Sequence, residues 1–399
     1  MAVGSSQPAF AVDTQASPSQ ASLRWVDAGQ RVKKGVSRRK PQVGGSIVPK
    51  LISKSSESSS DISDEGSETC TLMVRRHGTP LQPALNETSS PRVRMLFNHF
   101  SESVAPIMVV LDSLNNGYRN IILPLACHDE VLGRAVSVVS AFHLAQKAPG
   151  LRPAAEAGHQ AIVAKLRRDS LQLTPEQLFN PYTLATILVL LVGETITGAD
   201  NYTYLLEMLN CLVKSPESIA MLPAGLQDFF LQQVKMFQLF GIPLASEAKG
   251  RKILTGPNEY LDFMECPLDL TPESEHYSNM DLMRSAIKDA CGIYRRRAEA
   301  SLDQDESIHM VEQLRHKVLG LDASTKGSHA LVWTYFVAAA ESKLPEHREF
   351  FSGRLGALYQ VTGFGSIPVA LQALKTIWAK QGLQRWTDIV SNETPILIM

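Results

Sequence analysis

The sequence predicts an all-α fold, with one large helical domain behind a disordered N-terminal region. Of its 399 residues, 44% are hydrophobic, which is enough to bury a large core. From Pro91 onward, apolar residues recur at helical spacing and strand-like alternation is not evident. Residues 1–90 are rich in Ser, Gln, Ala and Gly and offer little to bury. We therefore expect a disordered region over 1–90 and a helical domain over 91–399.

The strongest helical signal lies at residues 329–342. Trp333, Phe336, Val337 and Ala340 fall at positions i, i+3, i+4 and i+7, which is one face of a helix. Most of the remaining positions of this stretch are apolar as well. A helix that is apolar nearly all round is predicted to be an inner helix, covered by others.

The next elements are marked by proline and glycine. Pro345 suits the first turn of a new helix, and Glu346 favours the positive end of the helix dipole. The glycines of 361–365 can end that helix and turn the chain into another. Apolar residues at helical spacing over 367–378 predict this further helix, which is amphipathic.

The first half of the domain is also predicted to be helical. Helical spacing begins at Val93 and is interrupted by Pro106, and the apolar stretch 118–126 is broken by Pro124. Helices are expected at 131–144, 154–173, 181–198 and 202–213.

The middle of the chain, residues 215–326, reads as helical with longer loops. Five apolar residues mark a core helix here: Phe229, Phe230, Val234, Phe237 and Phe240. The acidic, proline-punctuated stretch 257–278 is expected to be irregular. The helix 280–300 carries arginines at 295–297, which could meet phosphate or acidic partners, although a solvated helix end is the preferred interpretation.

A basic block at residues 31–40 stands out within the N-terminal region. Six of its ten positions are positively charged: Arg31, Lys33, Lys34, Arg38, Arg39 and Lys40. A short block of this kind in an accessible segment is a candidate for nuclear import or nucleic-acid contact. The simpler interpretation is a solvated run of charges.

Residues 54–68 are acidic and rich in serine, so their charge is opposite in sign to that of the basic block 31–40. Such a segment cannot offset its chain entropy by burial, so we expect it to stay disordered. Phosphorylation of these serines would add up to about two negative charges each. This segment could be a regulatory or activating tail or a plain linker, and the sequence favours neither interpretation.

Composition excludes several classes of protein. The net charge of −1 gives the whole chain no general attraction for nucleic acid or membranes. The five cysteines lie far apart and form no C-x-x-C pair, so no zinc site is predicted. No N-terminal apolar leader is present, and the apolar run 185–193 is too short to span a bilayer.

Catalytic signatures are also lacking. The sequence has no G-x-x-x-x-G-K-[ST], H-E-x-x-H or G-x-S-x-G motif, and we expect no enzyme activity. Glu-x-x-His occurs at three places that could serve a helical-bundle metalloenzyme, a remote alternative: Glu156/His159, Glu273/His276 and Glu306/His309. Only His159 shares a face with apolar residues, so a hydrogen-bonded core or edge histidine is the preferred interpretation.

Two ordered sets of short motifs resemble a known family. The first set is His329, Leu331, Val332, Trp333 and 336–342, then His347, Arg348, Phe350 and Phe351, then 362–364, then Ala370, Leu371, Leu374 and Trp378, then 385–387. The second set is Phe97, Phe100 and Pro106, then 120–126, then Leu132, Ala135, Ser140, Ala141, His143 and Leu144, then 159–162 and 184–188. Together they resemble the fungal-specific transcription factor domain, an all-helical regulatory domain found downstream of a binuclear zinc cluster. The resemblance spans about residues 92–399. It is partial at 202–208, where relatives often have a Trp-x-x-His-Leu-x-Gly segment.

The resemblance implies a nuclear, pathway-specific regulator of transcription by RNA polymerase II in a fungus. Its partners would be DNA, the transcription machinery and a second copy in a homodimer, with no membrane. This sequence departs from the family pattern in one respect. It contains no binuclear zinc cluster, which needs six closely spaced cysteines. Either the cluster was lost, or the sequence begins downstream of it, or DNA is reached through a partner. We expect no cofactor in this chain, and zinc only if an upstream cysteine cluster exists. A non-DNA-binding interaction scaffold or co-regulator remains the alternative.

Overall fold

Helices build the part of the chain that the structure describes. The computed structural model describes residues 90–112, 115–213, 216–255, 258–264, 274–299 and 302–399. Over these residues there are sixteen α-helices, several short 3-10 or π-helical turns and no strand. The all-α prediction is therefore confirmed. The basic block 31–40 and the acidic serine-rich segment 54–68 lie outside the described residues.

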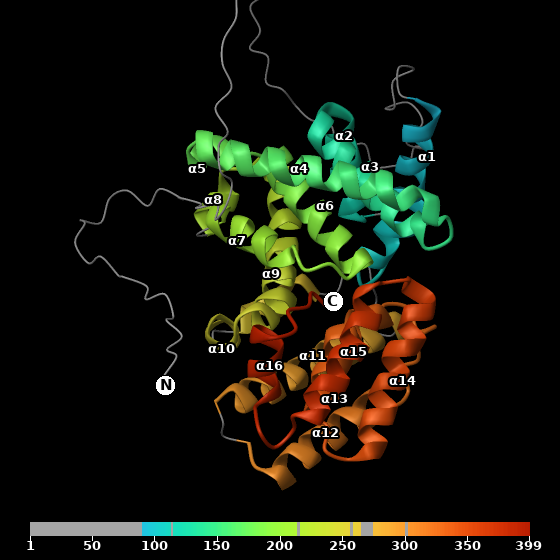
Figure 1. Cartoon of the computed structure of the whole chain (residues 1–399), viewed down its shortest axis with the longest axis vertical. Helices are drawn as coiled ribbons and strands as arrows, with labels where there is room; N and C mark the ends of the chain where they lie inside the picture. The colour runs from blue at the N-terminus through green and yellow to red at the C-terminus, as the bar shows by residue number, and fades with distance from the viewer. Residues whose placement is uncertain (1–89, 113–114, 214–215, 256–257, 265–273, 300–301) are drawn as a thin grey trace, which may run out of the picture. The chain divides into compact units, whose positions relative to one another are not determined.

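The first group of helices runs from Ser90 to the middle of the chain (Figure 1). Its α-helices are α1 (Pro91–His99), α2 (Leu123–His128), α3 (Glu130–Ala145), α4 (Arg152–Gln172), α5 (Pro175–Leu178), α6 (Pro181–Thr197), α7 (Tyr202–Leu212), α8 (Pro216–Ala220) and α9 (Ala224–Ala245). Its short turns are Phe100–Val104, Ala105–Met108, Tyr118–Ile122 and Pro149–Leu151.

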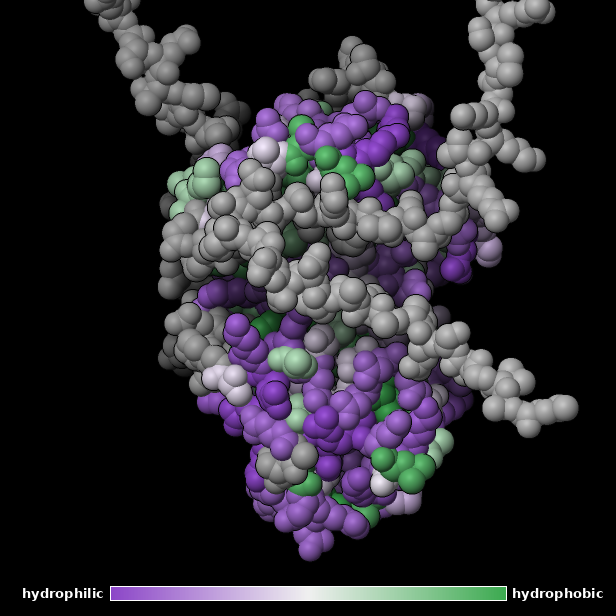
Figure 2. All heavy atoms as spheres, turned by 60° about the vertical axis from the view of Figure 1, so that its left-hand side comes forward, coloured by the Kyte–Doolittle hydropathy of each residue, from purple (hydrophilic) through white to green (hydrophobic). Residues whose placement is uncertain are grey.

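The second group follows α9 without a break in the chain. Its α-helices are α10 (Glu247–Leu254), α11 (Glu275–Ala298), α12 (Gln304–Val318), α13 (Val332–Glu341), α14 (Pro345–Thr362), α15 (Ser366–Ala379) and α16 (Trp386–Asn392). Its 3-10 turns are Asn258–Met264 and Ser328–Leu331. Hydrophilic residues cover much of the described surface on the face drawn in Figure 2, and hydrophobic ones appear there as small separate areas.

Local sequence signals start and stop these helices as expected. Pro181 opens α6, and the Asn180 side chain accepts a hydrogen bond from the Thr183 amide at 2.9 Å. Pro345 lies in the first turn of α14 in the same way. Gly363 ends α14 with a φ of 66°, a left-handed conformation that glycine adopts without a Cβ clash.

Two inner helices, α6 and α13, organise the core. All residues from Leu184 to Ile196 in α6 and all ten residues of α13 are buried. Helix α6 packs against α3, α7 and α15, and α13 packs against α11, α14 and α15. Each fully buried Leu or Phe contributes roughly 1.5–3 kcal/mol relative to an exposed one, so these two helices carry much of the hydrophobic stabilisation.

Backbone contact joins the end of α6 to the turn between α14 and α15. The Gly365 amide donates to the Ile196 carbonyl at 2.9 Å. A Cβ added at Gly198 would lie 2.6 Å from the Gly365 carbonyl oxygen, which is too close for any side chain. The glycine turn predicted at 361–365 therefore also provides a close approach between the two helix groups.

The structure differs from expectation at three places. Pro124 does not break the 118–126 stretch, because it lies in the first turn of α2, where its missing N–H is not needed. Helix α12 lies within the stretch 215–326 that was expected to be helical, but it was not identified individually, since its buried residues form only a narrow stripe: Ser307, Val311, Leu314 and Val318. Part of the stretch expected to be irregular is ordered as the turn Asn258–Met264 and the start of α11, and residues 265–273 lie outside the description.

Candidate functional site

A buried carboxylate, Glu341, lies at the end of the inner helix α13. It is 1% exposed, and it is the one carboxylate in this buried and mostly apolar helix. Oε2 accepts hydrogen bonds from Arg297 Nε at 2.9 Å and from Trp386 Nε1 at 2.8 Å. Oε1 accepts from Arg297 Nη2 and from the Ser307 hydroxyl. A buried charge is tolerated when it is paired and fully hydrogen-bonded, and Glu341 meets both conditions.

Four helices supply this arrangement. Arg297 lies in the last turn of α11, Ser307 in the first turns of α12, and Trp386 at the start of α16. The planar Arg297 guanidinium binds the carboxylate with two parallel N–H donors, a geometry that lysine cannot provide. The hydrogen bond to Glu341 raises the pKa of Arg297. The carboxylate thus connects segments far apart in the sequence.

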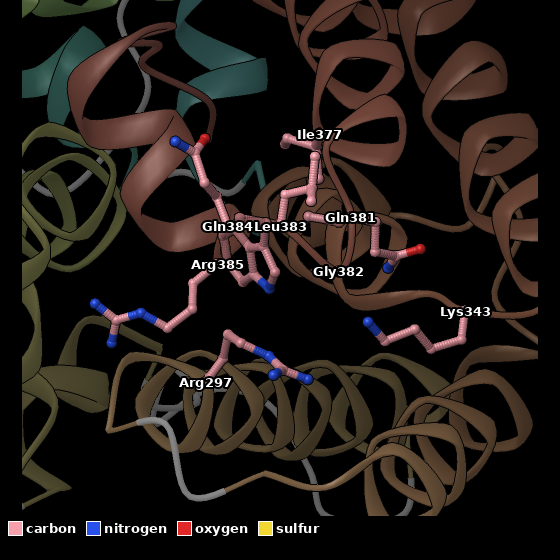
Figure 3. A pocket seen from close by; sticks show the side chains of 10 residues that line it. Arg297, Lys343, Ile377, Gln381, Gly382, Leu383, Gln384 and Arg385 are labelled. Carbon is pink, nitrogen blue, oxygen red and sulfur yellow. The ribbon is translucent and has the colours of Figure 1, made fainter.

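A pocket of about 230 Å³ opens beside this arrangement (Figure 3). Its lining residues are Arg297, Ala340, Lys343, Ile377, Gln381, Gly382, Leu383, Gln384, Arg385 and Trp386. Figure 3 shows Arg297 and Lys343 extending toward the same space from opposite sides, whereas Arg385 points away from Lys343. At the rim, Gly382 adopts a φ of 93° and the Leu383 side chain is 84% exposed.

Three cations line the pocket, and two of them have carboxylate partners. Arg297 is paired with Glu341. Arg385 lies 3.0 Å from a Glu247 oxygen and 2.9 Å from an Asp388 oxygen. It also donates to the Ala298 carbonyl at 2.6 Å. Both guanidinium groups are therefore held in place before any ligand arrives.

Lys343 is the third cation and differs from the other two. Among the residues that the structure describes, no carboxylate oxygen lies within 4.0 Å of its ammonium. Burial lowers its pKa, and the nearby Arg297 and Arg348 lower it further, while Glu341 opposes them. The Lys343 charge is thus half-buried and uncompensated by an ion pair.

Hydrogen bonds to the end of α13 fix the wall of the pocket. Trp378 Nε1 donates to the Ala339 carbonyl at 2.8 Å. Gln381 Nε2 and Arg348 Nε donate to the Ser342 carbonyl at 3.1 and 3.2 Å. These donors satisfy carbonyls that a helix end leaves without intrahelical partners. The segment that carries Lys343 is therefore anchored to α14 and α15.

The structure does not bring the Glu-x-x-His pairs together. Glu156 pairs with Arg152 on the surface of α4, and Glu306 pairs with Arg296. Within the described ranges, no three His, Cys, Asp or Glu side chains are grouped so that they could hold a metal ion. Glu273 lies outside those ranges.

His159 is buried, as the sequence suggested, but its contacts differ from those of the hydrogen-bonded histidine that was expected. The residue is 8% exposed in α4, and Nε2 lies 3.1 Å from Glu194 Oε1 of α6. That contact is close enough for an ion pair when the imidazole is protonated, yet its geometry is not that of a hydrogen bond. The ring also meets the edge of Phe142 with centroids 5.9 Å apart. The expected hydrogen bond is therefore not formed with any described residue.

The arginines 295–297 do not behave as one solvated helix end. Arg295 is exposed, Arg296 pairs with Glu306, and Arg297 is committed to Glu341. Sequence reasoning missed the role of Arg297. The signal that could have found it was Glu341, a lone acid in a helix predicted to be buried.

The import candidates Arg31, Lys33, Lys34, Arg38, Arg39 and Lys40 lie outside the described residues, so their role stays a prediction. A search of the described helices found none that is long and apolar enough to cross a membrane.

Comparison with known proteins gives one match. A family model described as the fungal specific transcription factor domain matches residues 95–238 and 258–399. The first stretch covers most of α1–α9, and the second contains every residue of the pocket. No curated protein and no solved structure matches the chain.

Proposed function

Because this chain belongs to the family that carries the fungal-specific transcription factor domain, we propose that it regulates pathway-specific transcription by RNA polymerase II in the nucleus of a fungal cell. The family match over residues 95–238 and 258–399 is the observation that carries the proposal. The all-helical fold and the inner helices α6 and α13 are consistent with a regulatory domain.

The proposed role is regulatory and not enzymatic. Two of the three cations at the candidate site are engaged in ion pairs that hold helices together, Arg297 with Glu341 and Arg385 with Glu247. We propose that the chain needs no cofactor of its own, and that zinc belongs to the protein only if a cysteine cluster precedes this sequence.

A tethering experiment tests the regulatory role. The full chain is fused to an unrelated DNA-binding domain and brought to a reporter promoter in a fungal host. We expect reporter transcription to change by at least severalfold in either direction relative to the DNA-binding domain alone. Unchanged transcription at equal nuclear protein levels would contradict the proposal.

Nuclear import is assigned to the basic block. Replacement of Lys33, Lys34, Arg38, Arg39 and Lys40 by alanine is expected to move a fluorescently tagged chain from the nucleus to the cytoplasm. A matched control replaces five exposed basic residues elsewhere: Arg92, Arg94, Arg168, Lys252 and Arg295. If both variants remain nuclear, the block has no import role.

The co-regulator alternative rests on the cysteine pattern, because five widely spaced cysteines provide no binuclear zinc cluster in this chain. A basic block can hold phosphates, but it does not specify a base sequence. The co-regulator alternative therefore predicts that the purified chain shows no specific binding to promoter DNA and retains a protein partner. Sequence-specific binding by the purified chain would exclude the co-regulator alternative.

A further inference from the structure

We propose that the pocket beside Lys343 binds a small amphipathic molecule with a single carboxylate, which pairs with the Lys343 ammonium while its apolar part packs against Ile377, Leu383 and Trp386. The binding inference stands on the pocket alone. Only its regulatory consequence, described below, rests on the proposed function.

Charge defines the polar end of the ligand. The Glu341 carboxylate is saturated by donors from Arg297, Ser307 and Trp386, so it balances Arg297 and leaves no acceptor oxygen for Lys343. Arg385 is balanced by Glu247 and Asp388. Lys343 is therefore the one cation of the described pocket lining that lies half-buried without an ion-pair partner. A single negative charge on a ligand would compensate it, and a half-buried ion pair is stronger than one in open water.

The opposite wall defines the apolar end. Ala340, Ile377 and Trp386 are 0%, 1% and 4% exposed and form a packed floor, so their positions do not depend on a ligand. Leu383 is 84% exposed at the rim. An apolar group in the pocket would remove part of the Leu383 side chain from water, which favours binding by roughly 25 cal/mol for each Å² buried.

Size and charge together exclude other ligands. The cavity of about 230 Å³ is smaller than the 300–1,000 Å³ typical of sites for drug-sized molecules. A folded peptide segment or a nucleotide does not fit in this space. A phosphate dianion would bring two charges to the single described lining cation that has no ion-pair partner, because Arg297 and Arg385 already have carboxylate partners. A short monocarboxylic acid satisfies both limits.

Ligand binding would connect four parts of the fold. The lining comes from the end of α11, the end of α13 with the segment after it, the end of α15 with the α15–α16 turn, and the start of α16. A ligand that pairs with Lys343 and packs on Leu383 would join the segment after α13 to the α15–α16 turn. If the chain regulates transcription as proposed, this is where a metabolite could alter its activity.

The test uses two matched probes, hexanoate and hexanamide, with the purified full chain. They share the same alkyl chain and differ in charge at the head group. Titration followed by calorimetry and by saturation-transfer NMR is expected to show hexanoate binding at least about tenfold more tightly than hexanamide, the difference that one half-buried ion pair provides.

Two variants locate the site. Lys343→Met keeps the length of the side chain and removes its charge, so hexanoate should bind at least about tenfold more weakly and hexanamide should be unaffected. Leu383→Ala should weaken both probes by about the same factor, because it removes apolar surface only. The control is Lys375→Met, which removes an exposed charge from α15 outside the pocket lining and should change neither affinity.

Equal affinities for the two probes, no saturable binding of hexanoate, or an unchanged hexanoate affinity in Lys343→Met would each overturn the proposal. Circular dichroism of Lys343→Met establishes that the variant is folded. These measurements are made on purified protein, whereas the regulatory role is tested by reporter transcription. Failure of the ligand-binding proposal is therefore distinguishable from failure of the proposed regulatory function.

Discussion

Two buried glutamates, Glu194 in α6 and Glu341 in α13, lie in similar helices and have different surroundings. Each is 1% exposed and occupies an inner helix with few other polar residues. Glu341 receives four hydrogen bonds from α11, α12 and α16. Glu194 faces His159 at 3.1 Å, and in the described part of the chain no donor reaches its Oε2.

The difference shows that burial alone does not define the role of a carboxylate. Arginine is always charged in proteins, so the Arg297–Glu341 pair is a permanent connection between α11 and α13. Histidine is charged only when protonated, so the His159–Glu194 pair between α4 and α6 depends on a proton. The first region is held by fixed charges and the second by a contact that can change.

The largest effect is expected from Glu341→Gln, which leaves the Arg297 guanidinium, 17% exposed, without a counter-charge. Loss of one partner from a buried ion pair destabilises by about 3–5 kcal/mol. The free energy of unfolding in urea should fall by this amount. Glu130→Gln, which removes an exposed pair with Arg134, is the control and should cost less than about 1 kcal/mol. Equal losses in the free energy of unfolding from the two variants would mean that the buried Glu341 pair stabilises the fold no more than an exposed pair does.

A smaller effect is expected from Glu194→Gln. The amide keeps the shape of the side chain and removes the buried charge, while His159 remains as a neighbour that can be neutral. We expect a loss of about 1 kcal/mol in the free energy of unfolding, within the range of a single buried polar contact. A loss as large as that of Glu341→Gln would remove the contrast between the two glutamates.

The smallest effect is a difference in pH dependence between the two helix groups. His99 Nε2 lies 2.8 Å from His143 Nδ1 between α1 and α3. Burial, together with His143 and Lys147, lowers the pKa of His99 to about 4. As the pH falls, the unfolded chain binds a proton at His99 before the folded chain does. The contribution of neutral His99 to the free energy of unfolding should therefore be complete above about pH 6.5 and be lost as the pH falls toward 4. His99→Gln should flatten this part of the urea-unfolding profile. Burial also lowers the pKa of His143 and His329, so some slope will remain.

Glu312 of α12 should act in a lower pH range. Hydrogen bonds from Arg315 and then His347 lower its pKa to about 2. Its contribution is present above about pH 4.5, the value for the unfolded chain, and is lost as the pH falls toward 2. Glu312→Gln should flatten the unfolding profile below about pH 4.5. An unchanged slope in that range would contradict the assignment.

Periodicity predicted the inner helices well and the partners of their polar residues poorly. The apolar residues of α6 and α13 recur at helical spacing, which depends on local sequence alone. Helix α12 was not identified as a separate element within 215–326, because Val311 and Leu314 belong to a narrow buried stripe among polar neighbours. Arg297 and Glu341 are 44 residues apart, and no local pattern records which side chains tertiary packing will bring together. The nuclear-import block and the disorder expected before Pro91 stay predictions.

Trp386 has a consequence for spectroscopy. Its indole N–H donates to Glu341, its ring meets the edges of Tyr294 and Phe336 with centroids 5.5 and 6.4 Å apart, and it lines the pocket. Indole emission shifts in wavelength with the electric field of nearby charges. With the other tryptophans replaced by phenylalanine, the emission wavelength of Trp386 would report the binding of a charged ligand in the pocket without an attached dye.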